Sequence, residues 1–462
     1  MAADIDSGRF DLDDGIVHRL DRFVRDCMTE DGLPGVSVAV TDREGLKFAR
    51  GYGSRDLSSN DAATAETVYG IGSVSKSVAA LAVLTLVDEG DLTLDDPVVD
   101  HLDVSVPTDV TLHHLLSHTS GFPSLAVSEA LLARQMGVGE AGVPLGTAAD
   151  VRAHLAGASE ELADDPGERW MYCNTGYTLV GEVVEAVTGS SYTEFVRREL
   201  LDPIGMDRST FDGDRFESFE DRMTPYFPAQ DDSDELEPHP LPIREQSAAA
   251  GGLLAPVTDL AAYLRVHLRG GTTDADDRLI TAETLSRAYG AYAETPSGLY
   301  GYGWRTREVV GQTCIGHGGS IAVASAYAGF SPDNDVGVAV LANTSPPAGL
   351  TNLGLGVFAA LMGEAPEELP YFARRRRLRE LAGEYESYRG IKEATVEVEG
   401  GVLRVRIDGP IQEGSWLTLV PEDLDAGRFY TPSVAGEHIP VQFDESGDDR
   451  WLYIDRWRLR QR

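Results

Sequence analysis

The segment YGIGSVSKSVAALAVLTLVDEG, residues 69–90, has the composition of a buried helix that carries one charge. From about residue 73 to residue 89 its side chains are mostly apolar, and Gly90 follows where helices commonly end. Lys76 lies near the start of this stretch and is one of only three lysines in the chain. Because burying a charge costs free energy, this lysine is a candidate for a chemical role.

Ser73 stands three residues before Lys76. Residues three apart on a helix lie on one face, so both side chains can point into the same cleft. A serine hydroxyl becomes a good nucleophile when a nearby base takes its proton, and a desolvated lysine can act as that base. Backbone N–H groups at the helix start can stabilise an oxyanion. The same spacing would also fit an exposed lysine at a helix start, so the pair alone is only suggestive.

The order of strand and helix patterns predicts a divided sheet. Residues 36–40 (VSVAV) and 47–53 are predicted to form paired strands. Residues 111–290 are mainly helical or loop in pattern, and strands return at 321–330 and 336–342. We therefore expect the middle of the chain to be inserted into a sheet built from both ends.

The character of the sequence changes near the C-terminus. A short basic helix is predicted around Arg374–Arg377, and residues 394–407 (ATVEVEGGVLRVRI) then alternate with period two around Gly400–Gly401. We expect two domains, residues 1–370 and a C-terminal antiparallel β domain of residues 371–462.

Composition excludes several classes of partner. The 462 residues include 76 acidic and 39 basic side chains, a formal net charge of −37, which argues against nucleic acids and anionic membranes. The N-terminal stretch MAADIDSGRFDLDDG has no basic and apolar regions of a secretory signal, so a cytoplasmic protein is expected. The excess of carboxylates over lysines resembles proteins of salt-accumulating halophiles, and we expect stability to fall in dilute buffer.

Cysteine and histidine spacing gives little support for a metal or a disulfide. The three cysteines are far apart and without a C-x-x-C pair, so they are expected to be reduced. His113, His114 and His118 invite a metal interpretation, because His114 and His118 are one helical turn apart. No acidic residue stands at the position that an H-E-x-x-H site requires, so we expect no metal and no cofactor.

Two further segments contain motifs that, together with the serine–lysine pair, make up a set of three motifs in order. GERWMYCNTGY contains Tyr172-Cys-Asn174, and CIGHGGS contains His317-Gly-Gly-Ser320, which is predicted to form a turn immediately before a strand. Together with the Ser73-x-x-Lys76 pair they resemble, in order and spacing, the signature elements of the serine β-lactamase and penicillin-binding-protein superfamily. The resemblance is greatest to the class C β-lactamase branch, with its esterase and D-aminopeptidase relatives, and it covers roughly residues 15–360.

This resemblance implies a fold and a set of roles. The implied fold class is α/β (α+β), an antiparallel sheet flanked by helices with an all-helical insert, plus a barrel-like C-terminal β domain. Ser73 would be the nucleophile that forms an acyl-enzyme, and Lys76 would share its proton and keep Tyr172 near a reactive protonation state. Tyr172 would act as base toward Ser73 and then as acid toward the leaving group.

The remaining motif residues would bind the substrate. The backbone N–H groups of Ser73 and Ser320 would form the oxyanion hole. The substrate-binding residues that the resemblance implies are Asn174, His317, Gly318 and Gly319. His317 replaces the lysine of true β-lactamases, and an imidazole is a less reliable partner for a carboxylate near pH 7. This departure favours esters and D-amino-acid peptides over β-lactams.

We therefore expect a serine hydrolase that acts through an acyl-enzyme on a small ester or on a peptide or amide, D-amino-acid substrates included. A β-lactam hydrolase and a non-catalytic homologue that binds a ligand in the cleft remain alternatives. The expected partner is a small-molecule or short-peptide substrate, with no nucleic acid and no membrane. The C-terminal domain resembles barrel-like domains that shape the substrate pocket or mediate assembly in some relatives, so the oligomeric state stays open, a homo-oligomer through this domain included.

Overall fold

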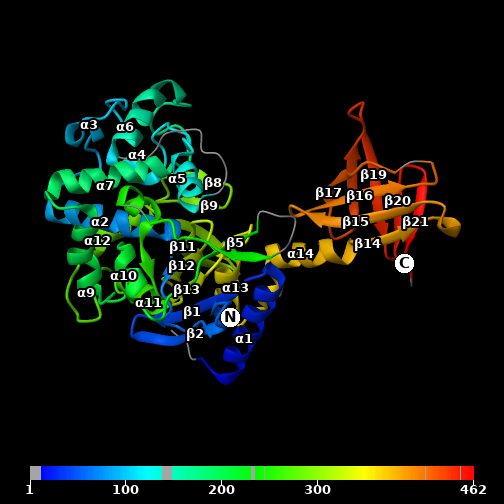
Figure 1. The fold of residues 1–462 in the computed structure, drawn as a ribbon, viewed down its shortest axis with the longest axis horizontal. Helices are drawn as coiled ribbons and strands as arrows, with labels where there is room; N and C mark the ends of the chain where they lie inside the picture. Colours follow the sequence, from blue (N-terminus) through cyan, green and yellow to red (C-terminus); the bar gives the residue numbers. More distant parts are fainter. Residues whose placement is uncertain (1–11, 138–147, 230–234, 244, 412, 448) are drawn as a thin grey trace, which may run out of the picture. The chain divides into compact units, whose positions relative to one another are not determined.

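The computed structural model describes residues 12–137, 148–229, 235–243, 245–411, 413–447 and 449–462. The N-terminal stretch in which we predict no export signal lies outside these ranges, except for its last four residues. The chain divides into two compact units between Glu364 and Ala365 (Figure 1). No helix within the described ranges is both long and apolar enough to cross a membrane.

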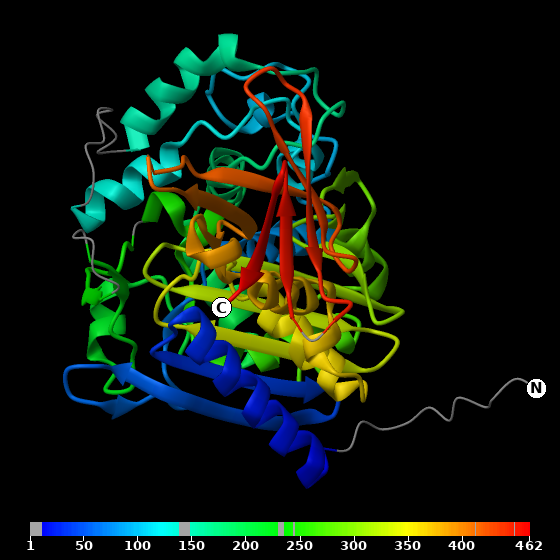
Figure 2. The same cartoon turned by 90° about the vertical axis from the view of Figure 1, so that its right-hand side faces the viewer.

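A nine-stranded antiparallel sheet forms the framework of the first unit, and its order is β3-β2-β1-β13-β12-β11-β10-β9-β8 (Figures 1 and 2). The strands are β1 (Gly35–Asp42), β2 (Gly45–Asp56), β3 (Asp61–Ala62), β8 (Ala293–Thr295), β9 (Gly298–Tyr300), β10 (Arg305–Val309), β11 (Gln312–Ser320), β12 (Ser325–Ser331) and β13 (Val336–Ala342). β1 pairs with β13, Val36 opposite Ala342, so the predicted sheet built from both ends of this unit is confirmed.

Helices cover both faces of the sheet, so its central strands are buried throughout. Helix α11 (Val257–Leu268) packs on β1 and β13, while α13 (Thr351–Leu361) packs on β12 and β13. Helix α1 (Asp14–Asp31) packs on α13. Because both faces of these strands are buried, their sequences are continuous runs of mostly apolar or small residues and do not alternate between apolar and polar residues.

The segment that opens with Tyr69 forms the short strand β4 (Tyr69–Gly70), the 3-10 turn η1 (Gly72–Val74) and helix α2 (Ser75–Glu89). Every residue of α2 from Ser75 to Leu86 is buried. Gly90 ends the helix in the left-handed region with φ near +87°, as predicted. Ser73 belongs to the 3-10 turn just before the α-helix, not to the helix itself.

Most of the described chain between β3 and β8 is helical, as the resemblance implies. Two small two-stranded sheets interrupt it, β4 with β7 (Leu254–Ala255) and β5 (Tyr226–Pro228) with β6 (Leu236–Pro238). The helices and helical turns of this region, besides α2 and α11, are α3 (Val98–His101), α4 (Leu112–Ser117), α5 (Val127–Met136), α6 (Ala148–Gly157), η2 (Ala158–Glu161), α7 (Asn174–Thr188), α8 (Tyr192–Val196), η3 (Arg197–Leu201), α9 (Asp202–Ile204), α10 (Gly213–Ser218), η4 (Glu245–Ser247), η5 (Ala248–Gly252), α12 (Ala282–Ser286) and η6 (Arg287–Tyr289).

The second unit is a closed barrel of eight antiparallel strands, in which each strand pairs with the next and β14 closes on β21. Its strands are β14 (Gly383–Glu386), β15 (Glu393–Glu399), β16 (Val402–Asp408), β17 (Leu417–Asp423), β18 (Arg428–Pro432), β19 (His438–Asp444), β20 (Trp451–Ile454) and β21 (Trp457–Gln461). The turns η7 (Pro366–Glu368) and η8 (Tyr388–Gly390) and the basic helix α14 (Pro370–Leu381) complete this unit.

Apolar side chains fill the interior of the barrel. Val396, Leu403 and Val405 point inward from the predicted hairpin, and Leu378 and Leu381 of α14 join the same core. Gly400–Gly401 forms the turn of that hairpin with positive φ at both residues, as the sequence predicts.

Candidate active site

Three of the predicted catalytic residues meet at the start of α2. The Nζ atom of Lys76 lies 3.2 Å from Oγ of Ser73 and donates at 2.6 Å to Oδ1 of Asn174, the first residue of α7. It also donates at 2.6 Å to the carbonyl oxygen of Ala250 in η5. The hydroxyl of Tyr172 is hydrogen-bonded to Ser73. The side chains of Lys76 and Tyr172 therefore meet at the Ser73 hydroxyl, and Asn174 and the Ala250 carbonyl hold the amine in place.

Lys76 is fully buried, and none of these hydrogen-bond partners is a carboxylate. Its Nζ lies 4.8 Å from the ring centre of Tyr172 and 5.4 Å from that of Tyr177. Burial disfavours the charged ammonium and lowers the pKa of Lys76 to about 7. A large fraction of this amine is therefore neutral near pH 7 and able to accept a proton.

Tyr172 is held in its neutral form. Burial raises the pKa of Tyr172 well above its usual value, although the hydrogen bond with Ser73 acts in the opposite direction. The ring lies against His118 at a tilt of 41°, with 4.3 Å between ring centres, and Nδ1 of His118 accepts a hydrogen bond from the backbone N–H of Cys173. Of the two groups near Ser73, Lys76 has the pKa closer to neutrality.

The backbones of η1 and β11 approach each other so closely that only glycine fits. A Cβ atom at Gly72 would lie 2.6 Å from the backbone nitrogen of Ser320. One at Gly319 would lie 2.0 Å from the carbonyl oxygen of Ile71 and 3.0 Å from the backbone nitrogen of Ser73. The two glycines thus bring the backbone N–H groups of Ser73 and Ser320 to the same place.

The segment His317–Ser320 is the end of strand β11, not the turn before a strand that the sequence analysis assumed. Its pairing with β12 runs through Ser320 opposite Ser325, whereas its pairing with β10 stops at Gly316 opposite Arg305. One edge of this segment is consequently unpaired beside Ser73, where an extended substrate can align.

His317 is 4% exposed and has both ring nitrogens engaged. Its Nε2 lies 3.1 Å from the hydroxyl of Tyr300, and its Nδ1 lies 2.6 Å from the carbonyl oxygen of Gly318. Burial lowers the pKa of His317 to about 3. These partners assign a neutral ring that donates from Nδ1 and accepts at Nε2, so His317 supplies no positive charge to a substrate.

Two arginines on β10, which the sequence analysis missed, supply positive charge beside His317. The guanidinium of Arg305 lies 5.0 Å from the ring centre of Trp170 and 5.1 Å from that of Tyr300. It donates to the hydroxyls of Thr295 and Ser297, both at 2.9 Å. Arg305 and Arg307 stand two residues apart, and residues with that spacing on a strand face the same side of the sheet. This spacing was the sequence signal for the pair.

These arginines line a cavity of about 520 Å³. Its lining residues are Tyr172, Ser297, Arg305, Arg307, His317, Gly318, Gly319, Ser320, Ala326, Gly349, Leu350, Thr351 and Asn352. A smaller cavity of about 60 Å³ adjoins Ser73 and is lined mainly by apolar groups, among them Leu131, Leu132 and Ile321. Ser320 lines both cavities, so it stands between the cavity that holds the two arginines and the small, mainly apolar one.

The three histidines considered as metal ligands have separate partners. Nδ1 of His113 is bonded to the hydroxyl of Tyr302, and Nδ1 of His114 accepts from the backbone N–H of Thr111. His118 instead faces Tyr172. Over the described ranges, no group of three or more histidine, cysteine, aspartate or glutamate side chains could hold a metal ion.

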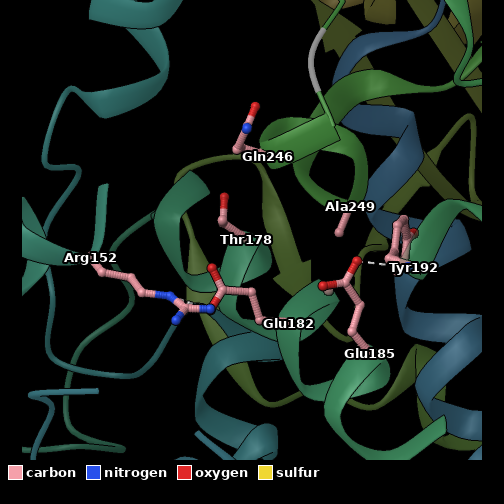
Figure 3. A pocket seen from close by; sticks show the side chains of 8 residues that line it. Arg152, Thr178, Glu182, Glu185, Tyr192, Gln246 and Ala249 are labelled. Atoms are coloured by element: carbon pink, nitrogen blue, oxygen red, sulfur yellow. Dashed lines mark hydrogen bonds and ion pairs between the residues drawn. The ribbon is translucent and has the colours of Figure 1, made fainter. Parts of the chain in front are cut away.

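A third pocket, of about 260 Å³, lies against another part of α7 (Figure 3). Arg152 pairs with Glu182 at 2.9 Å, and the backbone N–H of Tyr192 donates to Glu185 at 2.9 Å. None of the predicted site residues lines this pocket. The candidate chemistry therefore belongs to the cavities around Ser73.

The sheet with its helical insert and the neighbouring serine and lysine are features of β-lactamase-type serine hydrolases. The chain belongs to the β-lactamase family, whose model matches residues 20–356. A second family model, the Pab87 octamerisation domain, matches residues 366–460.

Curated relatives agree with this family. Penicillin-binding protein 4 of Amycolatopsis lactamdurans is 28% identical over 357 residues, which are 73% of this chain and 87% of that protein. Protein flp of Staphylococcus aureus is 26% identical over 333 residues, 70% of this chain and 62% of the relative.

Two solved structures extend the comparison. The octameric penicillin-binding protein homologue from Pyrococcus abyssi is 34% identical, with a TM-score of 0.88 over 96% of this chain and all of the other. A D-stereospecific amidohydrolase from Streptomyces sp. is 25% identical, with a TM-score of 0.62 over 75% of this chain and 99% of the other. The first comparison includes both units, and the second is limited to three quarters of the chain.

Replacing Gly319 with alanine is expected to slow the reaction of Ser73 about 100-fold or more, because the methyl group would push apart the N–H groups of Ser73 and Ser320. The rate of labelling by a fluorophosphonate measures this effect. Gly157→Ala is the control, since no atom lies within 4 Å of its added Cβ. A folded Gly319→Ala protein that is labelled at the wild-type rate would contradict the assignment.

Proposed function

We propose that the protein is a serine hydrolase of the class C-related branch that cleaves small esters, or peptides and amides including those with D-amino acids. The supporting observation is the buried Lys76 amine, 3.2 Å from Ser73 Oγ and with a pKa near 7. The amidohydrolase and penicillin-binding-protein relatives support this class of substrate.

The proposed reaction begins with transfer of the Ser73 hydroxyl proton to neutral Lys76, directly or through Tyr172. Oγ then attacks the substrate carbonyl, and the N–H groups of Ser73 and Ser320 stabilise the negative oxygen. The carbon–nitrogen or carbon–oxygen bond breaks as Tyr172 gives its proton to the leaving group and regains one from Lys76. Water hydrolyses the acyl-enzyme by the same proton transfers in reverse order.

The arginines of β10 favour a leaving group that carries a carboxylate. Arg305 remains protonated at neutral pH and presents a planar guanidinium, which suits a carboxylate better than the neutral ring of His317. A peptide with a free C-terminal carboxylate has this feature. A β-lactam also carries a carboxylate, so β-lactam hydrolysis remains the second candidate. A non-catalytic binding protein, by contrast, does not require an amine with a lowered pKa such as that of Lys76.

We further infer that copies of this chain associate through the C-terminal unit. The octamerisation-domain model covers almost the whole barrel, and the similar structure that covers both units is octameric. This assembly is independent of the proposed chemistry, so each can fail without the other.

The function is tested with a fluorophosphonate probe and a panel of p-nitrophenyl esters, D-amino-acid amides, D-peptides and nitrocefin, in concentrated salt. We expect the wild type to be labelled and to turn over at least one class, and Ser73→Ala to lose both activities. Lys76→Met is expected to slow acylation by several orders of magnitude, because the base is removed. Turnover that survives in Ser73→Ala would refute the mechanism, and a wild type that shows neither labelling nor turnover would favour the binding-protein alternative.

The acylation rate is expected to rise as the pH increases through about 7 and then to level off. Lys76 is mostly protonated below its pKa of about 7 and cannot accept a proton there, whereas it is neutral above that pKa. The pH dependence of kcat/KM measures this transition, because it reports on the free enzyme. A profile with no transition near 7 would contradict the lowered pKa of Lys76 on which the proposed mechanism rests.

Replacing Arg305 with glutamine is expected to raise KM about tenfold or more for a D-peptide with a free carboxylate, because one charge-assisted interaction is lost. The same peptide with an amidated C-terminus is the matched substrate, and its KM should change little. An equal effect on both peptides would indicate that Arg305 only supports the packing of Trp170 and Tyr300.

A further inference from the structure

The two rims of the C-terminal barrel differ, because helix α14 covers one of them and leaves the other exposed. Since consecutive strands are antiparallel neighbours around the closed barrel, successive connections alternate between its two rims. The connections after β14, β16, β18 and β20 therefore share one rim, which we call the apolar rim. The described residues of these connections are 387–392, 409–411, 413–416, 433–437 and 455–456.

The opposite rim is covered by helix α14. Arg374 donates to the carbonyl oxygen of Gly401, and Arg377 donates to those of Leu424 and Asp425. These acceptors belong to the connections after β15 and β17, and Arg450 after β19 bonds back to Glu380 at the end of the helix. All three connections of that rim are thus bound to α14 within the unit.

Large apolar side chains on the apolar rim are exposed. Tyr388 is 76% exposed, Ile391 60% and Ile411 95%, and Val434 is fully exposed. They are four of the nine large apolar side chains classed as exposed in the described ranges, although the whole unit is less than a quarter of the chain. The connections after β14 and β16 lie close together, since Nζ of Lys392 would be 2.5 Å from a Cβ at Gly409. Clustered exposed apolar groups mark interaction surfaces.

Charge on the apolar rim is balanced, unlike charge on the rest of the chain. Its connections hold three basic residues, Arg389, Lys392 and Arg456, and three acidic residues, Glu413, Glu437 and Asp455. The first unit holds 57 of the 76 acidic residues but only 24 of the 39 basic ones. Two copies therefore repel each other strongly through their first units, and least where the local charge is zero.

We propose that the apolar rim binds the apolar rim of a second copy of this chain. The proposal rests on the assembly inferred under Proposed function and specifies the surface that performs it. A two-fold contact requires a patch that complements itself, and equal numbers of opposite charges around exposed apolar groups meet that requirement. Contact between two such rims would bury Tyr388, Ile391, Ile411 and Val434 together.

Cross-linking tests whether two rims face each other. Cys27, Cys173 and Cys314 are all buried, so Val434→Cys adds one accessible thiol to the chain. A short bismaleimide should convert most of this variant to covalent dimers at low protein concentration. Leu57→Cys, at an exposed position of the first unit, is the control and should stay monomeric on a denaturing gel. Equal yields for the two variants would overturn the proposal.

Loss of association gives the complementary measurement. The double variant Ile411→Glu, Val434→Glu places four negative charges at each contact, so native mass spectrometry or light scattering should detect species of at most half the wild-type mass. Leu57→Glu is the control, and unchanged ester turnover with an unchanged circular dichroism spectrum verifies that both proteins are folded. A double variant with the wild-type mass would overturn the rim as the contact surface. A monomeric wild type would overturn the assembly itself and leave the hydrolase proposal untouched.

Discussion

The structure of the first unit depends on keeping one amine out of water without a carboxylate beside it. Lys76 is accommodated because α2 is buried along most of its length, among the helices and helical turns that pack around it. Its hydrogen bonds are to a serine, an amide oxygen and a backbone carbonyl, none of which carries a full charge. A carboxylate partner would stabilise the ammonium and raise the pKa again. The free-energy cost of this burial is thus converted into a base that is available at neutral pH.

The buried helix, its end at Gly90, the strands at both ends of the first unit and the β hairpin at Gly400 were predictable, because each has a local pattern. The closeness of Ser73 and Lys76 was predictable from their helical spacing, whereas their meeting with Tyr172 and Asn174 followed only from the resemblance. The state of His317 and the place of Arg305 were not predictable, because they depend on where β10 stops pairing with β11. The short strands β14 and β18 also lacked a signal, since β14 has one buried side chain and β18 ends in proline.

The buried amine of Lys76 and the guanidinium groups of β10 lie in different parts of the site. The amine of Lys76, whose pKa lies near 7, is fully enclosed and contacts Ser73, whereas Arg305 and Arg307 line the larger cavity. His317 lies between them in a neutral state. Under the proposed mechanism, a change of pH near neutrality therefore alters proton transfer at Lys76 while the guanidinium of Arg305 stays charged.

The pairing of β1 with β13 has a consequence for synthesis on the ribosome. Val36 pairs with Ala342, which is synthesised about 300 residues later, and Ser73 likewise contacts a segment around Ser320 that is synthesised much later. The central sheet and the close approach of Ser73 to Ser320 can therefore form only after nearly the whole first unit has emerged, whereas each barrel hairpin can form as soon as it is made. During that interval the apolar strands are exposed in a nascent chain, and the high density of carboxylates in this unit opposes its aggregation.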